Sequence, residues 1–262
     1  MFDSSRFFTS IEINPTELCN FKCEFCPRAT FYPNKNLHMS RETIDLLISQ
    51  LPEMPNLQGI YLAGRGEPTL HNEFEYLVNS LVEYKSKHHK NLILHLATNG
   101  KRLNQYKDVL KKFYVMLSRY DETPDGFVDQ FASRNKTVVY DRRTKFITAD
   151  GDTGYHNRGG SVVLDITRVD NIAHEKYGLM CEKPFDVVYV NWNGDYNLCC
   201  NDWEDIEVLG NIKDQSLGKY ISVNAKLKAY QEDLLAGKRD RNPCAACNKK
   251  LCNSWVARTK KI

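Results

Sequence analysis

The sequence lacks several features that would place it in a broad class of protein. No run of 18 apolar residues occurs in the 262-residue chain, so no membrane-spanning helix is predicted. The amino terminus has no basic stretch followed by an apolar one, so we expect no secretory signal and a cytoplasmic protein. The formal net charge is only +3, which does not favour nucleic acid as a partner.

Cysteine is absent between residues 27 and 180, and the nine cysteines form two groups on either side of that gap. Three lie within Cys19–Cys26, and six lie from Cys181 onwards. A disulfide framework is typical of short secreted chains with an even number of cysteines. The odd number, the long chain and the clustering favour two metal sites in a reducing compartment.

Strand and helix signals alternate through the first half of the chain. Repeated strand–helix units predict a parallel sheet, and hence an α/β fold, because only a crossover returns the chain to begin a parallel strand. Chemistry in such folds takes place at the carboxyl ends of the strands. We predict strands at 11–14, 59–63, 91–97, 114–118 and 137–140, and helices at 40–51 (N-capped by Ser40), 72–87, 104–113 and 123–132.

The pattern changes after residue 140. Residues 141–170 are polar and rich in glycine, and they show no helical period. Residues 185–192 and 195–200 then predict a β-hairpin around Asn193-Gly194, since this dipeptide is the strongest short hairpin signal. A helix is expected from about 219 to 236. We therefore expect two domains, 1–170 and 171–262.

The run Cys19-x3-Cys23-x2-Cys26 follows the first predicted strand. Three thiolates at this spacing can hold three corners of an iron–sulfur cubane and leave the fourth iron open to a small molecule. Two alternatives remain at this point, a zinc knuckle with His38 as fourth ligand and three buried thiols.

This run resembles the signature of the radical SAM superfamily, in which the open iron of a [4Fe–4S] cluster binds S-adenosyl-L-methionine. The turn Gly64-Arg-Gly-Glu-Pro68 and the strand end Leu96-Ala-Thr-Asn-Gly100 also resemble that family. Arg65 stands where the family often has glycine. The resemblance implies a partial (β/α)6 TIM-like barrel. It also implies cofactor contacts from Gly64, Gly66, Glu67, Pro68, Asn99, Ser118 and Asp121.

The second cysteine group resembles the SPASM/twitch extensions of the same superfamily. Cys181 is followed by Gly194-x4-Cys199 and by the distal pair Cys244-x2-Cys247. The resemblance implies one auxiliary [4Fe–4S] cluster on these four cysteines, in a small domain of a β-hairpin and a helix. Cys200 should point to the opposite face, Cys252 could replace a ligand, and a four-thiolate zinc site is the alternative.

The segment Tyr155-His-Asn-Arg-Gly-Gly160 resembles a motif that precedes these extensions, which implies that Arg158 reaches the cofactor or the substrate. Its alternative is a polar turn. For the acid or base that serves the substrate, the sequence selects no single residue. The candidates are Tyr61, His71, His95, Arg119 and Glu182.

Taken together, the resemblance implies a radical SAM oxidoreductase with two [4Fe–4S] clusters. It would cleave S-adenosyl-L-methionine reductively to a 5′-deoxyadenosyl radical, and that radical would abstract hydrogen from a small polar substrate. The short twitch dehydrogenases of the 2-deoxy-scyllo-inosamine type suggest oxidation of a sugar or cyclitol alcohol, with the auxiliary cluster accepting the second electron. A flavodoxin- or ferredoxin-type protein would supply the first electron.

Two other functions are weighed against this one. The first is a maturase that crosslinks a ribosomally made peptide, although only about ten residues precede the first predicted strand. The second is a zinc protein or an electron-transfer protein without catalysis, which would need neither an open iron nor the Gly-Glu-Pro turn.

Overall fold

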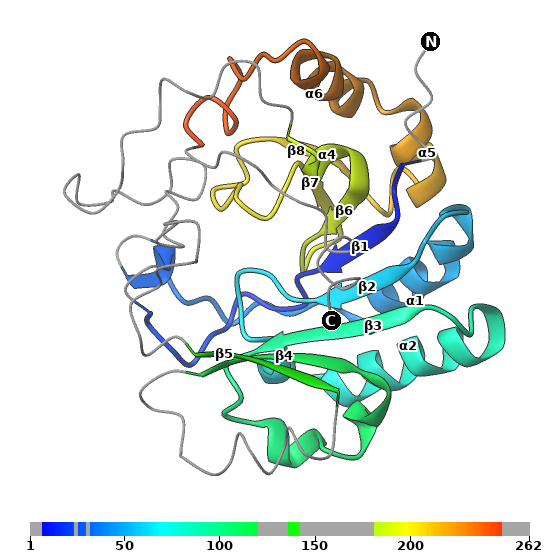
Figure 1. The fold of residues 1–262 in the computed structure, drawn as a ribbon, viewed down its shortest axis with the longest axis vertical. Helices are drawn as coiled ribbons and strands as arrows, with labels where there is room; N and C mark the ends of the chain where they lie inside the picture. The colour runs from blue at the N-terminus through cyan, green and yellow to red at the C-terminus, as the bar shows by residue number, and fades with distance from the viewer. Residues whose placement is uncertain (1–6, 24–25, 30–31, 120–135, 142–180, 248–262) are drawn as a thin grey trace.

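An eight-stranded sheet organises the computed structural model, which describes residues 7–23, 26–29, 32–119, 136–141 and 181–247 (Figure 1). The strand order is β5-β4-β3-β2-β1-β6-β7-β8. Neighbouring strands from β5 to β6 are parallel, and the β6-β7 and β7-β8 pairs are antiparallel. The strands are β1 (Ser10–Ile13), β2 (Gly59–Leu62), β3 (Ile93–Thr98), β4 (Tyr114–Arg119), β5 (Thr137–Asp141), β6 (Val187–Val190), β7 (Asp195–Asn197) and β8 (Val208–Asn211).

Five α-helices accompany the sheet in the described residues. In Figure 1, α1 and α2 lie together on one side of the parallel strands, while α5 and α6 lie beside the antiparallel end. Six parallel strands with helices on one side confirm the predicted partial barrel. The helices are α1 (Arg41–Gln50), α2 (Phe74–His88), α4 (Lys183–Asp186), α5 (Leu217–Val223) and α6 (Ala225–Leu235). None of them is long and apolar enough to cross a membrane.

The parallel strands present two different faces because successive side chains alternate. Ile11, Ile60 and Leu94 belong to the same apolar core as the buried faces of α1 and α2. The intervening residues of neighbouring strands share one register, in which Glu12 pairs with Tyr61, and Tyr61 pairs with His95. The face turned away from the helices therefore carries polar and aromatic side chains.

Two helices differ from the sequence prediction. The segment predicted as a helix at 104–113 forms two 3₁₀ turns, Leu103–Tyr106 and Val109–Lys112, which are anchored by the buried Leu103 and Leu110. The helix predicted at 219–236 is broken into α5 and α6 at Asn224. This residue has extended backbone (ψ 115°) and caps α6 by accepting a hydrogen bond from the backbone N–H of Leu227 at 2.9 Å. Its amide also donates to the Leu209 carbonyl at 2.7 Å, so tertiary contacts fix the break.

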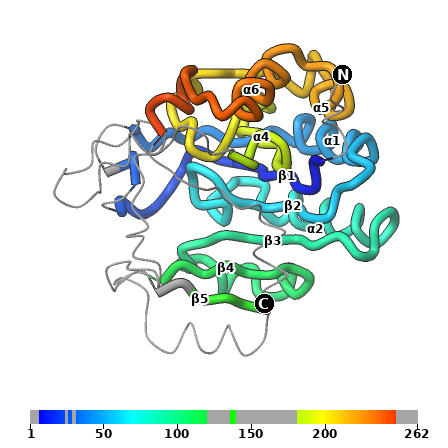
Figure 2. Tube along the Cα trace, turned by 45° about the horizontal axis from the view of Figure 1, so that its top comes forward, coloured from blue at the N-terminus to red at the C-terminus, as the bar shows by residue number. Residues whose placement is uncertain are grey.

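The β6–β7 hairpin, which lies between Cys181 and Cys199, continues the parallel sheet, because β6 pairs with β1 in parallel. Figure 2 shows α4 next to β1, with α5 and α6 above them. The expected boundary near residue 170 and the helix predicted at 123–132 lie outside the described residues.

Candidate functional site

The first three cysteines lie in the loop that follows β1, at the carboxyl edge of the sheet. The Cys26 N–H donates to the Cys23 carbonyl at 2.9 Å, which closes a turn between these two residues. The side chain of Asn34 holds Cys19 through two hydrogen bonds of 2.8 Å, one to its N–H and one to its carbonyl. Burial raises the pKa of the Cys19 thiol, and the nearby charges of Glu67 and Cys26 raise it further.

The turn at 64–68 packs directly against this loop. Gly64 has φ +118°, and a β-carbon there would lie 2.6 Å from the Asn14 side chain. A β-carbon on Gly66 would lie only 2.0 Å from the Thr16 carbonyl oxygen. The Glu67 N–H donates to the Leu18 carbonyl at 2.9 Å. Glycine is needed at position 64 because of its positive φ and the close Asn14 side chain, and at position 66 because two backbones approach each other closely.

Glu67 joins the turn to the end of β3. Its Oε1 accepts hydrogen bonds from the Thr69 hydroxyl at 2.6 Å, the Thr69 N–H at 3.2 Å and the Thr98 hydroxyl at 2.7 Å. Its Oε2 accepts from the Asn99 N–H at 2.8 Å. Burial raises the pKa of Glu67, whereas these four hydrogen bonds favour the carboxylate. Pro68, which follows it, begins the 3₁₀ turn Pro68–Leu70.

The remaining predicted cofactor residues are placed as follows. Asn99 follows β3 and donates through its side-chain amide to Asn20 at 2.8 Å, so it contacts the first cysteine loop. Ser118 lies near the carboxyl end of β4 and is half-buried. Asp121 and Arg158 lie outside the described residues.

Three of the candidate acids and bases, Tyr61, His71 and His95, are held by contacts within the protein. His71 uses both ring nitrogens, one with the Met39 carbonyl at 2.8 Å and the other with the Glu73 N–H at 3.0 Å. The His95 ring stacks on Tyr61 at 4.3 Å and lies 5.5 Å from the Tyr114 ring. Burial lowers the pKa of His95 to about 4. Arg119 ends β4, and Glu182 precedes α4.

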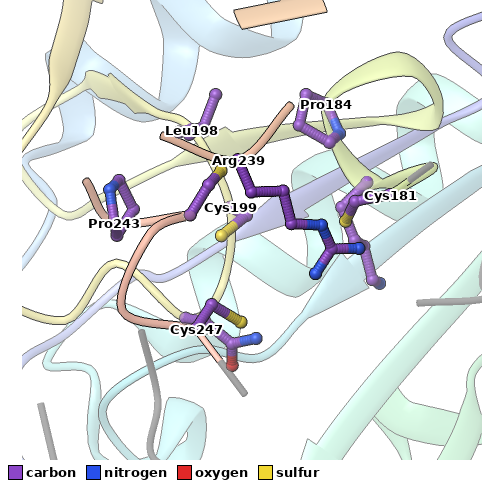
Figure 3. A pocket seen from close by; sticks show the side chains of 10 residues that line it. Cys181, Pro184, Leu198, Cys199, Arg239, Pro243 and Cys247 are labelled. Carbon is purple, nitrogen blue, oxygen red and sulfur yellow. The ribbon is translucent and has the colours of Figure 1, made fainter. Parts of the chain in front are cut away.

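The second cysteine group converges on one pocket. Cys181 precedes α4, Cys199 follows β7, and Cys244 and Cys247 follow α6. All four line the pocket, and Figure 3 shows Cys199 and Cys247 on one side of the Arg239 side chain and Cys181 on the other. The other lining residues are Lys183, Pro184, Leu198, Asn201, Arg239 and Pro243. The structure thus brings together thiols that are up to 66 positions apart in the sequence (Cys181 to Cys247).

The chemistry of this pocket suits an iron–sulfur cluster. Burial raises the pKa of Cys199 well above its usual value, and the neighbouring charges of Cys200, Cys247 and Cys244 act in the same direction. Thiolates so close to one another need a bound cation to remain deprotonated, and metal binding displaces their protons. Lys183 and Arg239 are both buried at the pocket and carry positive charge, which offsets the negative charge of four thiolates.

The same cysteines do not have the geometry of a site for one ion. Within the described ranges, no group of three or more His, Cys, Asp and Glu side chains is arranged to hold a single metal ion. A tetrahedral zinc with bonds of about 2.3 Å would draw its sulfurs to within roughly 4 Å of one another. A [4Fe–4S] cubane differs from a single ion because each of its thiolate ligands binds its own iron.

A second pocket lies between the turn at 64–68 and the second cysteine group. Its lining includes Gly64 of the turn and both Cys199 and Cys200 of the second group. Cys199 lines both pockets and Cys200 only this one, and the predicted orientation of Cys200 toward the opposite face stays a prediction. The remaining lining residues are Glu12, Asn14, Arg65, Tyr189, Val190, Asn191 and Asn197. The polar residues that line this pocket were not among the site residues predicted from the sequence. The alternation in Ile11-Glu-Ile-Asn could have indicated that Glu12 and Asn14 leave the core face.

The comparisons with known proteins agree with this geometry. A profile described as the Radical SAM superfamily matches residues 13–165, more than half of the chain, and one described as an iron–sulfur cluster-binding domain (SPASM) matches residues 181–248. The S-adenosyl-L-methionine-dependent 2-deoxy-scyllo-inosamine dehydrogenase of Niallia circulans is 26% identical over 253 residues, which cover 93% of this chain and 94% of that enzyme.

Solved structures show the same fold. The crystal structure of BtrN in complex with AdoMet and 2-DOIA has a TM-score of 0.72 at 24% identity, and the match covers 92% of this chain and 93% of that one. Streptococcus suis SuiB bound to its precursor peptide SuiA has a TM-score of 0.63 at 15% identity, covering 97% and 73% respectively. The chain therefore belongs to the radical SAM superfamily, as an oxidoreductase with a SPASM-type C-terminal region whose cofactors are S-adenosyl-L-methionine and two [4Fe–4S] clusters.

Proposed function

We propose that this enzyme oxidises an alcohol carbon of a small polyhydroxylated molecule, a sugar or a cyclitol, to a ketone. The observation that carries the proposal is the second pocket, which lies between the turn at 64–68 and the second cysteine group. Its lining includes Gly64, from the turn at 64–68 that is proposed to contact the cofactor (the cofactor turn), and Cys199, from the second cysteine group. A substrate in this pocket would lie between the site where a hydrogen atom is removed and the site where an electron can leave.

The lining of this pocket is suited to hydroxyl groups. The side-chain amides of Asn14, Asn191 and Asn197 each donate one hydrogen to a carboxylate of the protein, respectively Glu17, Asp195 and Asp205. Each amide has a second hydrogen that can donate to a substrate, and the Glu12 carboxylate accepts hydrogen bonds. Such groups recognise a ring that carries several hydroxyls or an amine. The relative from Niallia circulans is named for a substrate of this kind, which supports the same class here.

In this proposal Cys19, Cys23 and Cys26 hold the first cluster, and Cys181, Cys199, Cys244 and Cys247 hold the auxiliary one. The cofactor is contacted by Gly64, Gly66, Glu67, Pro68, Asn99 and Ser118, with Asp121 and Arg158 as further members. When bound, these groups supply a radical that removes a hydrogen atom from the carbinol carbon and an acceptor for the second electron, and the alcohol becomes a ketone on losing a proton.

The chain itself contributes orientation and exclusion of water. The buried Glu67 and its four hydrogen bonds fix the turn against the end of β3. Asn14 extends this support, because its Oδ1 accepts from the Arg65 N–H at 3.1 Å. A flavodoxin- or ferredoxin-type protein is proposed as the source of the first electron.

The test uses anaerobically reconstituted enzyme with dithionite, S-adenosyl-L-methionine and a panel of substrates deuterated at the carbinol carbon. The panel holds 2-deoxy-scyllo-inosamine, neutral cyclitols, sugars and short peptides. We expect ketone and 5′-deoxyadenosine in equal amounts, with deuterium transferred to the 5′-deoxyadenosine. A panel on which only peptides become crosslinked, or on which no 5′-deoxyadenosine forms, would contradict the proposal.

Cysteine variants separate the two proposed clusters. Cys19→Ala should abolish 5′-deoxyadenosine formation, whereas Cys244→Ala should preserve much of it and lose the ketone. Ser49→Ala is the control, because this exposed residue lines neither the auxiliary pocket nor the proposed substrate pocket, and it should retain both products.

A further inference from the structure

Arg65 links the cofactor turn to the loop that follows the auxiliary cysteines. Its backbone lies in the turn at 64–68, and its side chain reaches the loop formed by residues 202–207, 137 and 140 positions further along the chain. The guanidinium donates to Asp205 through both terminal nitrogens, at 2.7 Å for the bond from Nη1 to Oδ2. It also donates to the Asp202 carbonyl at 2.7 Å. The Arg65 side chain is only 8% exposed, whereas that of Asp205 is 32% exposed, so the pair lies at the edge of the buried interior.

The loop at 202–207 is shaped to receive this arginine. Asp205 has φ +52°, a left-handed conformation that is uncommon for a residue other than glycine. Its carboxylate also accepts a hydrogen bond from the Asn197 amide at 2.6 Å. The Asp202 carboxylate accepts from the N–H groups of Ile206 at 2.9 Å and Glu207 at 3.1 Å, which closes the loop on itself.

The loop that carries the first three cysteines also contacts Arg65. Arg28 donates to the Arg65 carbonyl at 2.7 Å and pairs with the buried Glu17 at 3.3 Å. The ring of Trp203 lies edge-on to that of Tyr32 at 5.4 Å. The turn at 64–68, the first cysteine loop and the loop at 202–207 thus meet at one cluster, in which Arg28, Arg65 and Glu17 are buried and Asp205 is partly exposed.

We propose that Arg65 is a positioning residue that transmits binding of S-adenosyl-L-methionine at the turn to the loop at 202–207, and so to the adjacent Cys199 and Cys200. This inference rests on the proposed function, in which the turn contacts the cofactor. A bidentate guanidinium–carboxylate pair fixes orientation as well as distance. A shift of the turn on binding the cofactor must therefore move the loop or break the pair. Arg65 also stands where the family often has glycine, so we expect the Arg65–Asp205 pair to be a feature of this chain.

The test measures hydrogen–deuterium exchange of peptides that cover 202–207 in the anaerobic holoenzyme, with and without S-adenosyl-L-methionine. We expect the cofactor to slow exchange by at least about fivefold in the wild-type enzyme, the lower range of typical couplings between sites. Arg65→Met should abolish this slowing, and Arg65→Lys should restore part of it, because lysine keeps the charge but not the fork. Arg241→Met, which breaks an exposed ion pair with Asp233, is the matched control and should leave it unchanged.

Cofactor binding is followed separately through the electron paramagnetic resonance spectrum of the first cluster. The inference is overturned if the cofactor binds and the loop does not respond, or if Arg65→Met responds as the wild type does. Should Arg65→Met not fold, Asp205→Asn tests the other end of the pair and must reduce the response. None of these measurements needs an alcohol substrate, so failure to find a ketone would reject only the proposed reaction. Failure of S-adenosyl-L-methionine to bind would reject both.

Discussion

Gly66→Ala should separate the cofactor turn from the first cysteine loop. The added β-carbon would lie 2.0 Å from the Thr16 carbonyl oxygen and 2.8 Å from that of Leu18, whereas ordinary contact begins at 3.4 Å. Both neighbours are backbone atoms, so neither can rotate away as a side chain would. The two segments must move apart by more than 1 Å, on the order of the 1.4 Å by which the closest contact is too short.

This displacement has a cost that can be bounded. Overpacking of a well-packed interior typically costs about 1–3 kcal/mol. The hydrogen bond from the Glu67 N–H to the Leu18 carbonyl lies beside the clash, and its loss leaves buried groups unpaired at about 1–3 kcal/mol more. We therefore expect the free energy of unfolding to fall by about 2–6 kcal/mol. The affinity for S-adenosyl-L-methionine should fall with it, because the turn no longer faces the cysteine loop correctly.

The assay is urea unfolding of the anaerobic protein, together with the cofactor-dependent spectrum of the first cluster. Gly218→Ala is the matched control. Its β-carbon would meet the Glu53 carboxylate at 2.6 Å. This carboxylate is the end of a side chain that can turn aside, and the hydrogen bonds it would lose to Ser216 and the Gly218 N–H are exposed, so the cost should be well below that of Gly66→Ala. A Gly66→Ala protein with unfolding free energy within 1 kcal/mol of wild type and unchanged cofactor binding would refute the reasoning.

Three further predictions concern single buried groups. In Glu67→Gln the side-chain NH₂ group must face either the Asn99 N–H or the hydrogen-bond donors of the two threonines, so at least one hydrogen bond is lost. The unfolding free energy should fall by about 2 kcal/mol, measured by urea unfolding. His95 has a folded-state pKa of about 4, so the unfolded state binds more protons between pH 6.5 and 4 and stability is lost as pH falls through that window. Between pH 7.5 and 5 this loss is about 2 kcal/mol, and His95→Phe should remove it from the pH profile of thermal unfolding. Lys183→Met removes a buried cation from the auxiliary pocket, and the midpoint potential of the auxiliary cluster should become more negative by roughly 50–100 mV, measured by redox titration.

Each of these predictions has a control and a contrary outcome. Glu75→Gln changes an exposed carboxylate and should leave stability unchanged, so equal effects at positions 67 and 75 would remove the argument from hydrogen bonding. An unaltered pH profile in His95→Phe would show that other groups cause the acid sensitivity. An auxiliary potential that moves as much in Lys213→Met, where the lysine is exposed, would show that the effect is not local to the pocket.

Local features could be predicted from the sequence with good accuracy. The N-cap at Ser40 confirms the predicted start of α1, since a capping side chain acts only on the next three residues. Asn193-Gly194 likewise marked the turn between β6 and β7, and Gly194 has φ +89°. The break at Asn224 was not predicted, because its amide is held by the Leu209 carbonyl, 15 positions earlier in the chain.

The sequence by itself determined the two cysteine groups, the glycine-rich turn and the parallel order of strands, because each depends on spacing within a few residues or on alternating elements. The resemblance of the second cysteine group implied that Cys181, Cys199, Cys244 and Cys247 bind one cluster, and the structure shows them lining one pocket. Only the tertiary structure decided that a second pocket joins Gly64 to Cys199. It also decided that Arg65 pairs with Asp205. These arrangements follow from the pairing of β6 with β1, which brings the second half of the chain beside the first. Contacts across more than 100 residues are set by that register and leave no local pattern in the sequence.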